Sequence, residues 1–154
     1  MNNPKVKTVL AATIDDAADI AAIEAVCFSI PYDRETVEEL LTPTYRPSFI
    51  CRDCSGKMLG YLIGQSLMGE GDLLRIAVTP DARRSGVARK LIEAFIKKLQ
   101  EDGCHVCFLD VREHNLAAQA LYQSFGFQFF DRRHHYYHKP TDDALIMRLS
   151  ITSL

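Results

Sequence analysis

The feature that most constrains the fold is a strand that enters a short glycine-containing loop, from which a long amphipathic helix leaves. The strand is expected over residues 73–79, and the loop, residues 80–86, contains two arginines, a serine and a glycine. Beyond the loop, apolar residues recur at the three- and four-residue spacing of a helix. They are Ala88, Leu91, Ile92, Phe95, Ile96 and Leu99. A helix with such an apolar face packs on a sheet, which indicates an α/β chain.

The start of this helix is suited to holding a diphosphate. The first turn of a helix has unpaired N–H groups and a partial positive charge. Gly86 allows the backbone to come close to a ligand, and Arg83 and Arg84 add positive charge. The loop has neither the Walker motif nor the triple-glycine dinucleotide fingerprint. A diphosphate held without a dedicated metal site indicates a carrier such as coenzyme A, with an ordinary solvated turn as the alternative.

The rest of the chain is interpreted as one domain, residues 1–154, because it contains no repeat, linker or low-complexity segment. Further strands are expected over residues 6–12, 49–52, 58–67, 105–111, 127–132 and 144–151, the first at a sheet edge. Further helices are expected to start at caps formed by Asp15 or Asp16, by Asp33 and by Asn115. This order predicts a mixed α/β sheet with helices on its faces.

Charge and hydropathy exclude several classes of partner. Lys and Arg number 18 against 20 Asp and Glu, a formal net charge of −2. A broadly basic surface for nucleic acid or for a membrane is therefore not expected. No apolar run approaches the roughly 18 residues of a membrane span.

The cysteines and histidines do not indicate a metal site. Five cysteines are an odd number, which favours reduced thiols in a cytoplasmic protein over a disulfide framework. Two Cys-x-x-Cys pairs begin at Cys51 and Cys104, much farther apart than the roughly 15–20 residues usual in a zinc ribbon. His134, His135 and His138 have no ligand-spaced partners and are expected in a solvent-facing hairpin.

Several motifs resemble the GNAT acetyltransferase superfamily. Arg83-x-x-Gly86-x-Ala88 is similar to its Gln/Arg-x-x-Gly-x-Gly/Ala signature, which lies between the fourth strand and the third helix. The stretches LDVREHN (residues 109–115) and ALYQSFGF (residues 120–127) resemble the downstream half of the domain. Residues 132–137, RRHHYY, resemble its protein N-terminal branch, most of all the ribosomal-protein-alanine N-acetyltransferases, the RimI type. The resemblance implies the GNAT fold, a mixed, mostly antiparallel sheet of about seven strands with about four helices.

The resemblance also implies the activity and its residues. It implies an enzyme that uses acetyl-CoA to acetylate a protein N-terminal α-amine by direct attack in a ternary complex, with a ribosomal N-terminal alanine as one candidate acceptor. Asp110 takes the position of the general base and Tyr122 that of the general acid, while Tyr32, Tyr136 and Tyr137 resemble aromatic residues that grip a peptide N-terminus. The implied acetyl-CoA contacts are Ile76, Ala77, Val78, Arg83, Arg84, Ser85, Gly86, Val87, Ala88, Arg89 and Asn115.

The implied chemistry suits these groups. Transfer from a thioester to an amine needs a neutral nitrogen, a stabilised oxyanion and a proton for the thiolate. An α-amine has a pKa near 8, so roughly a tenth of it is uncharged at neutral pH, against a few parts in ten thousand for lysine. A modest base acting through water is therefore enough. Asp110 is one methylene shorter than the glutamate usual in the RimI type, which favours such a relay.

Each assignment has a structural alternative. Asp110 could be a buried carboxylate paired with Arg75 or Arg112, with Glu113 or His114 serving as the base instead. The aromatic residues of the expected site could be ordinary core residues. Two other functions stay open, a GNAT acetyltransferase for a small free amine and a non-catalytic acyl-CoA-binding module. The sequence also leaves open whether the chain is a monomer or a homodimer.

Overall fold

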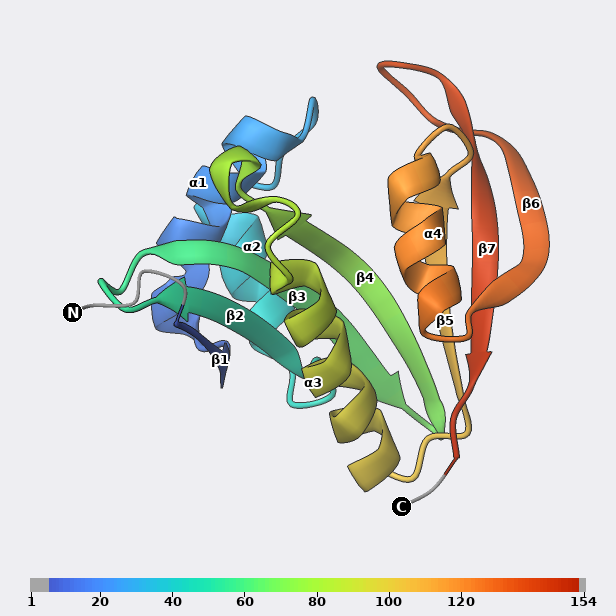
Figure 1. Cartoon of the computed structure of the whole chain (residues 1–154), viewed down its shortest axis with the longest axis horizontal. Helices are drawn as coiled ribbons and strands as arrows, with labels where there is room; N and C mark the ends of the chain where they lie inside the picture. The colour runs from blue at the N-terminus through green and yellow to red at the C-terminus, as the bar shows by residue number, and fades with distance from the viewer. Residues whose placement is uncertain (1–5, 153–154) are drawn as a thin grey trace.

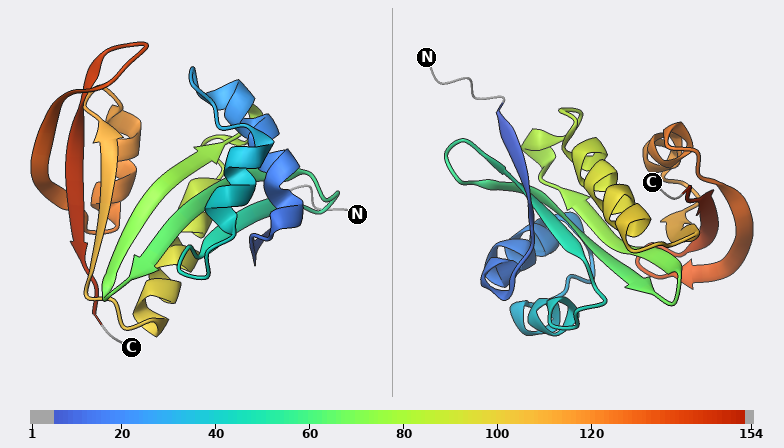
Figure 2. Two further views of the ribbon diagram at one scale, coloured as in Figure 1. Left: turned by 180° about the vertical axis from the view of Figure 1, so that it is seen from behind. Right: turned by 90° about the horizontal axis from the view of Figure 1, so that it is seen from below.

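The computed structural model describes residues 6–152 as a seven-stranded sheet with helices on both faces (Figures 1 and 2). The strand order is β1-β2-β3-β4-β5-β7-β6. The strands are β1 (Lys7–Ala11), β2 (Ser48–Asp53), β3 (Met58–Leu67), β4 (Glu70–Val78), β5 (Val106–Arg112), β6 (Gln128–Tyr137) and β7 (Asp142–Ser150). The helices are α1 (Ala17–Cys27), α2 (Arg34–Leu41), α3 (Val87–Glu101) and α4 (Leu116–Ser124), with 3-10 turns η1 (Ile14–Asp16) and η2 (Pro80–Ala82). Only β4 and β5 pair in parallel, so the expected mixed, mostly antiparallel sheet is confirmed.

Two of the three expected helix caps form. The Asp33 carboxylate accepts the Thr36 N–H at 2.8 Å, and the Asn115 side chain accepts the Ala118 N–H at 3.1 Å. The cap that Asp15 or Asp16 was expected to form at the first helix is absent, because a 3-10 turn precedes α1. Asp16 stands at the cap position of α1, but its carboxylate accepts no N–H of that helix. It accepts the Thr13 N–H at 2.8 Å, at the start of η1, and pairs with Arg52 at 2.9 Å.

The two faces of the sheet carry separate cores. On one face α3 buries its apolar side against β2, β3 and β4, with Leu91, Ile92 and Phe95 at most 1% exposed. On the other face Ile20 of α1 and Val37 of α2 are fully buried against β3. Figure 2 shows the pairs α1–α2 and α3–α4 on opposite sides of the sheet. The packing of helices on both faces of the sheet fixes the positions of β4 and β5.

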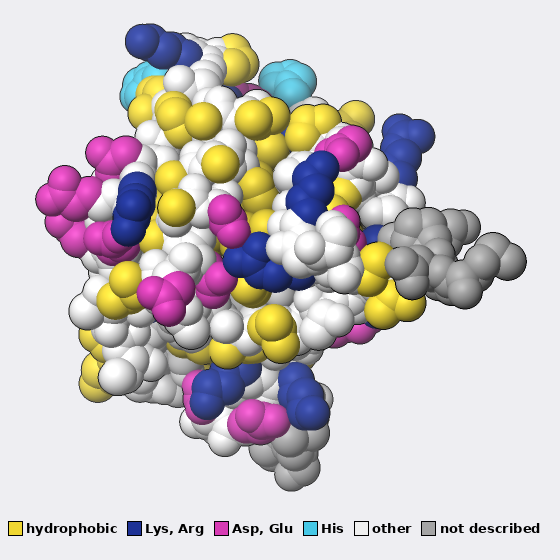
Figure 3. Space-filling view, turned by 90° about the vertical axis from the view of Figure 1, so that its left-hand side faces the viewer, with side chains coloured by type: hydrophobic (Ala, Val, Ile, Leu, Met, Phe, Trp, Pro, Cys, Tyr) yellow, Lys and Arg dark blue, Asp and Glu magenta, His cyan; other side chains and the backbone are white. Residues whose placement is uncertain are grey.

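The surface agrees with the nearly balanced charge. On the face in Figure 3, Lys and Arg side chains are interspersed with Asp and Glu. Within residues 6–152, none of the helices has the length and apolar character needed to span a bilayer.

The central feature of the sheet is that β4 and β5 pair only over their first residues. Glu70 to Leu73 lie opposite Val106 to Leu109, and from there the two strands diverge (Figure 1). The rest of β4 stays paired with β3, across a register shift between Ile63 and Gly64 that gives β4 one extra residue. One edge of β4 is therefore left without a strand partner at its carboxyl end, where the expected site begins.

We expect Gly64→Ala to destabilise the fold, because Gly64 lies under the ring of Phe95. A Cβ at Gly64 would lie 2.3 and 2.7 Å from ring carbons of Phe95 and 2.8 Å from the Pro47 carbonyl oxygen. Overpacking of this kind lowers the free energy of unfolding by about 1–3 kcal/mol, which urea denaturation will measure as a lower midpoint.

The partner change provides the control. Phe95→Leu removes the ring, so the double variant is expected to lose less stability than the sum of the two single changes. An unchanged midpoint for Gly64→Ala would contradict the close approach.

Candidate active site

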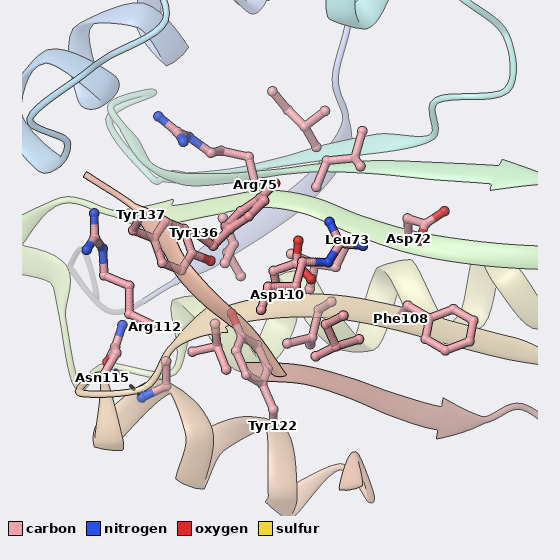
Figure 4. A pocket seen from close by; sticks show the side chains of 18 of the residues that line it. Asp72, Leu73, Arg75, Phe108, Asp110, Arg112, Asn115, Tyr122, Tyr136 and Tyr137 are labelled. Carbon is pink, nitrogen blue, oxygen red and sulfur yellow. Dashed lines mark hydrogen bonds between the residues drawn. The ribbon is translucent and has the colours of Figure 1, made fainter. Parts of the chain in front are cut away.

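A cavity of about 780 Å³ opens where β4 and β5 diverge (Figure 4). Its walls come from β4, β5, α4, the connection between α1 and α2, and the β6–β7 hairpin. Predicted site residues from distant parts of the chain border it together: Tyr32, Ile76, Asp110, Asn115, Tyr122, Tyr136 and Tyr137. The divergence thus gathers the expected catalytic and acceptor-binding residues around one space.

Asp110 lies on the cavity side of β5. Its neighbours Leu109 and Val111 point into the core, so strand alternation turns the Asp110 carboxylate outward, and the residue is exposed. Arg75 pairs with Glu24 at 2.9 Å, and Arg112 donates to backbone carbonyls beyond β6. Both arginines considered as partners of Asp110 are therefore engaged elsewhere, and the alternative of a buried, paired carboxylate is wrong.

The two alternative bases turn away from the cavity. Glu113 forms an ion pair with Arg132 at 2.7 Å, and Nδ1 of His114 lies 2.8 Å from the Asp142 carboxylate. That hydrogen bond raises the pKa of His114. Glu113, His114 and Asp142 are also the only group of three potential metal ligands found close together in residues 6–152, and they do not border the cavity.

Tyr122 combines a core role with access to the cavity. Its ring is 5% exposed and packs edge-on against Phe127, with 5.9 Å between ring centroids. The side chain also borders the cavity, and Figure 4 shows it rising from α4 toward β5 and Asp110. Burial, followed by the charge of Tyr137, raises the pKa of Tyr122 to about 12. At neutral pH the phenol therefore keeps a proton that it can donate.

The unpaired edge of β4 presents backbone donors on the side where β4 and β5 diverge. Of the predicted acetyl-CoA contacts, Ile76 and Asn115 border the cavity, whereas residues 77, 78 and 83–89 do not. The Thr79 N–H bonds to the Leu59 carbonyl at 2.8 Å, on the β3 side. Because successive N–H groups of a strand point to opposite sides, those of Val78 and Ile76 point toward the gap between β4 and β5. The Ala77 side chain is buried among core residues on the α1 face, so only its backbone is available to a ligand.

The loop before α3 leaves the helix N-terminus open. Arg84 and Gly86 have positive φ angles of 60° and 84°. The Lys90 N–H is the first bonded back to Gly86, at 3.1 Å, and no side chain caps this end. The N–H groups of residues 87–89 therefore keep no partner within the helix, and the 15-residue helix adds its dipole to them.

Most of the polar side chains in and around the loop are bonded to groups of the protein itself. Arg83 donates to the Val78 carbonyl at 3.3 Å, and Arg89 donates to the Ser124 hydroxyl at 2.9 Å. The Ser85 hydroxyl donates to the Ala82 carbonyl. Lys7, which the sequence did not indicate, donates to the Ser85 carbonyl at 2.7 Å. Backbone N–H groups are therefore the main means by which this loop can hold an anion.

Asn115 serves two purposes. Its side-chain oxygen caps α4, and the residue borders the cavity, where its amide nitrogen can donate to a ligand.

Sequence reasoning missed Glu24, which is 0% exposed beside the cavity. Its carboxylate accepts from Arg75, from the Tyr32 N–H at 3.1 Å and from the Tyr61 hydroxyl. A signal was present, because Glu24 falls at helical spacing with Ile20, Ile23 and Cys27 and so lies on the buried face of α1.

Comparison with known proteins finds matches to acetyltransferases. The family model described as "Acetyltransferase (GNAT) family" matches residues 17–127. The [ribosomal protein bS18]-alanine N-acetyltransferase of Escherichia coli (strain K12) is 42% identical over 102 residues, 64% of this chain and 68% of that protein.

Two solved structures have similar folds. The crystal structure of the ribosomal-protein-S18-alanine N-acetyltransferase from Escherichia coli has a TM-score of 0.89 at 32% identity, covering 97% of this chain and 96% of that one. A chain of the NatC complex bound to Gag peptide and CoA has a TM-score of 0.85 at 24% identity, covering 95% and 99%, which shows likeness of fold.

We expect Gly86→Ala to weaken acetyl-CoA binding, because an L-residue at φ 84° is strained. A Cβ there meets nothing within 4 Å, so strain acts without a clash. The strain costs about 1–2 kcal/mol, and the loop can relieve it by shifting away from the conformation that binds acetyl-CoA. Titration calorimetry should therefore record an affinity for acetyl-CoA about tenfold lower.

Gly56→Ala is the matched control. Gly56 has φ 88° and nothing within 4 Å, but it lies in the β2–β3 turn. The same strain there is expected to lower stability and leave acetyl-CoA affinity unchanged. Equal acetyl-CoA affinities for the wild type, Gly86→Ala and Gly56→Ala would show that the loop before α3 is not part of the acetyl-CoA site.

Proposed function

Because the chain belongs to the acetyltransferase (GNAT) family, we propose that it transfers the acetyl group of acetyl-CoA to the N-terminal α-amine of a protein, with the N-terminal alanine of a ribosomal protein as the favoured acceptor. The observation that carries the proposal is the cavity between β4 and β5. Asp110, Tyr122 and the tyrosines expected to bind the acceptor border it together. The names of the similar E. coli protein and structure support the choice of acceptor.

We assign acetyl-CoA, the acetyl donor, to the side of the gap between β4 and β5 that faces the N-terminus of α3. The open N–H groups of residues 87–89 would bind the diphosphate, with Arg84 adding charge. The pantetheine arm would follow residues 76–78, and the amide nitrogen of Asn115 would bond to it. The Val78 N–H would then donate to the thioester carbonyl, where negative charge develops during attack.

The acceptor amine would attack that carbonyl from the side of Asp110. Asp110 takes a proton from the ammonium through water, which leaves a neutral nitrogen. The C–N bond forms, and the nitrogen, now positively charged, loses a second proton to water. The tetrahedral intermediate then collapses and the C–S bond breaks. Tyr122 gives its phenolic proton to the departing thiolate, and burial helps here because it also raises the pKa of a thiolate. Solvent then reprotonates Tyr122.

The acceptor side has aromatic walls. Tyr32 lies in the α1–α2 connection, while Tyr136 and Tyr137 come from β6, their ring centroids 5.1 Å apart. Arg112 lies over the Tyr137 ring at 4.3 Å and braces it. Rigid rings and hydroxyls suit a peptide N-terminus, and we propose these tyrosines as acceptor-binding residues.

Three further points stay predictions. These are the single domain over residues 1–154, a place in the cytoplasm, and the choice between a monomer and a homodimer. β6 lies at one edge of the sheet and is the strand through which a second copy could pair.

The proposed acceptor class is tested with peptides. Short peptides with an N-terminal alanine should be acetylated, and the same peptides with a blocked N-terminus but an internal lysine should not, as followed by mass spectrometry. Equal transfer to both would exclude the α-amine. Transfer only to small free amines would favour the alternative enzyme, and binding of acetyl-CoA without transfer would favour the binding module.

Tyr122→Phe and Asp110→Asn test the proposed roles. Each should lower kcat for the peptide by about 10²-fold or more, because each removes a proton-transfer group, and acetyl-CoA affinity should be kept. Tyr45→Phe and Asp15→Asn are the matched controls, since both residues are exposed and outside the cavity. A variant at Tyr122 or Asp110 with full kcat would contradict its assignment.

A further inference from the structure

Arg75 sits between two aromatic rings of the α1–α2 connection. Its guanidinium carbon lies 3.6 Å from the ring centroid of Phe28 and 4.2 Å from that of Tyr32. Nη2 also reaches the Ile30 carbonyl at 3.4 Å. Arg75 therefore contacts this connection, residues 28–33, near its start, middle and end. The connection has no helix or strand of its own to order it.

Glu24 holds the guanidinium from the other side. Nε of Arg75 lies 3.1 Å and Nη2 lies 2.9 Å from its carboxylate oxygens, a two-pronged pair. The same carboxylate accepts the Tyr32 N–H at 3.1 Å, so it is bonded directly to the end of the connection. Glu24 is fully buried, and the Arg75 side chain is 21% exposed and borders the cavity.

We infer that Arg75 is a positioning residue that holds the α1–α2 connection over the acceptor end of the cavity, so that Tyr32 is in place before the acceptor arrives. The inference rests on the proposed function. Ordering a segment of six residues costs conformational entropy, which the acceptor would otherwise supply from its own binding energy. A planar guanidinium suits this task because it can stack on two rings and pair with a carboxylate at once, which an ammonium group cannot.

The position of Arg75 explains why the effect should fall on the acceptor. Arg75 stands on β4 directly after the extra residue of the register shift, at the point where β4 leaves β5. Its hydrogen bonds and ring contacts all go to α1 and to the connection after it. None goes to the loop before α3. Loss of Arg75 should therefore loosen the acceptor side and spare the donor side.

Arg75→Met and Arg75→Lys test the inference. For Arg75→Met we expect the KM of an N-terminal alanine peptide to rise at least tenfold, while the dissociation constant of acetyl-CoA stays within about twofold. Amide hydrogen exchange should become faster in residues 28–33. Arg75→Lys keeps the charge but not the fork, so it should also raise KM, by a smaller factor, and it provides the test if Arg75→Met does not fold.

Arg52→Met is the matched control. Arg52 is also a strand arginine, its side chain is 22% exposed, and it pairs with Asp16 and Asp19 at 2.9 and 3.0 Å, outside the cavity. We expect it to unfold at lower urea concentration and to keep the wild-type KM. If both Arg75 variants keep the wild-type KM and exchange pattern, or if KM changes as much in Arg52→Met, the inference is overturned.

Hydrogen exchange separates the two proposals, because it needs no acceptor. Faster exchange confined to residues 28–33 in a protein that acetylates no peptide would refute the proposed function, and would support only the ordering of the connection by Arg75. Peptide acetylation by the wild type with unchanged exchange and KM in the variants would support the function and refute the positioning role.

Discussion

The divergence of β4 from β5 is the constraint on which the rest of the structure depends. Backbone groups at a strand edge normally bond to a neighbouring strand, and here those of Ile76 and Val78 have none on the β5 side. Such an edge is stable only if the strands are fixed by other contacts. α3 supplies them on one face and α1 on the other, each packed against β3 and β4. The two cores thus keep open a gap whose polar edge can be satisfied by a substrate.

Several charged side chains near the gap are held by specific partners. The buried Glu24 is compensated by Arg75, and removal of one partner of such a pair commonly costs about 3–5 kcal/mol. Arg83 and Arg89 are fixed on Val78 and Ser124. The positive end of α3 therefore lies in a rigid frame and does not depend on flexible side chains. A binding site fixed beforehand spends less of a ligand's interaction energy on ordering the protein.

Local patterns in the sequence predicted the elements well, because their causes are local. Helical spacing located α3, and the side chains of Asp33 and Asn115 cap α2 and α4 as expected. The pairing of Glu24 with Arg75 could not be predicted this way, since 51 positions separate the two residues. No local pattern around either residue indicates the other as its partner. The same is true of the divergence of β4 from β5. The placing of Asp110 and Tyr122 at one cavity came from family resemblance and needed the tertiary structure to test it.

The proton balance of the acceptor amine is itself a means of choosing the acceptor. Asp110 is exposed at the cavity wall, where it can relay a proton from the amine through water. In such a relay the supply of neutral amine is set by the pKa of the amine itself. An α-amine needs little help, since roughly a tenth of it is neutral at pH 7, whereas lysine is neutral in only a few parts in ten thousand. A site that draws on the amine already neutral in solution therefore favours the chain terminus over lysine side chains by about two orders of magnitude, before any contact with the peptide is counted.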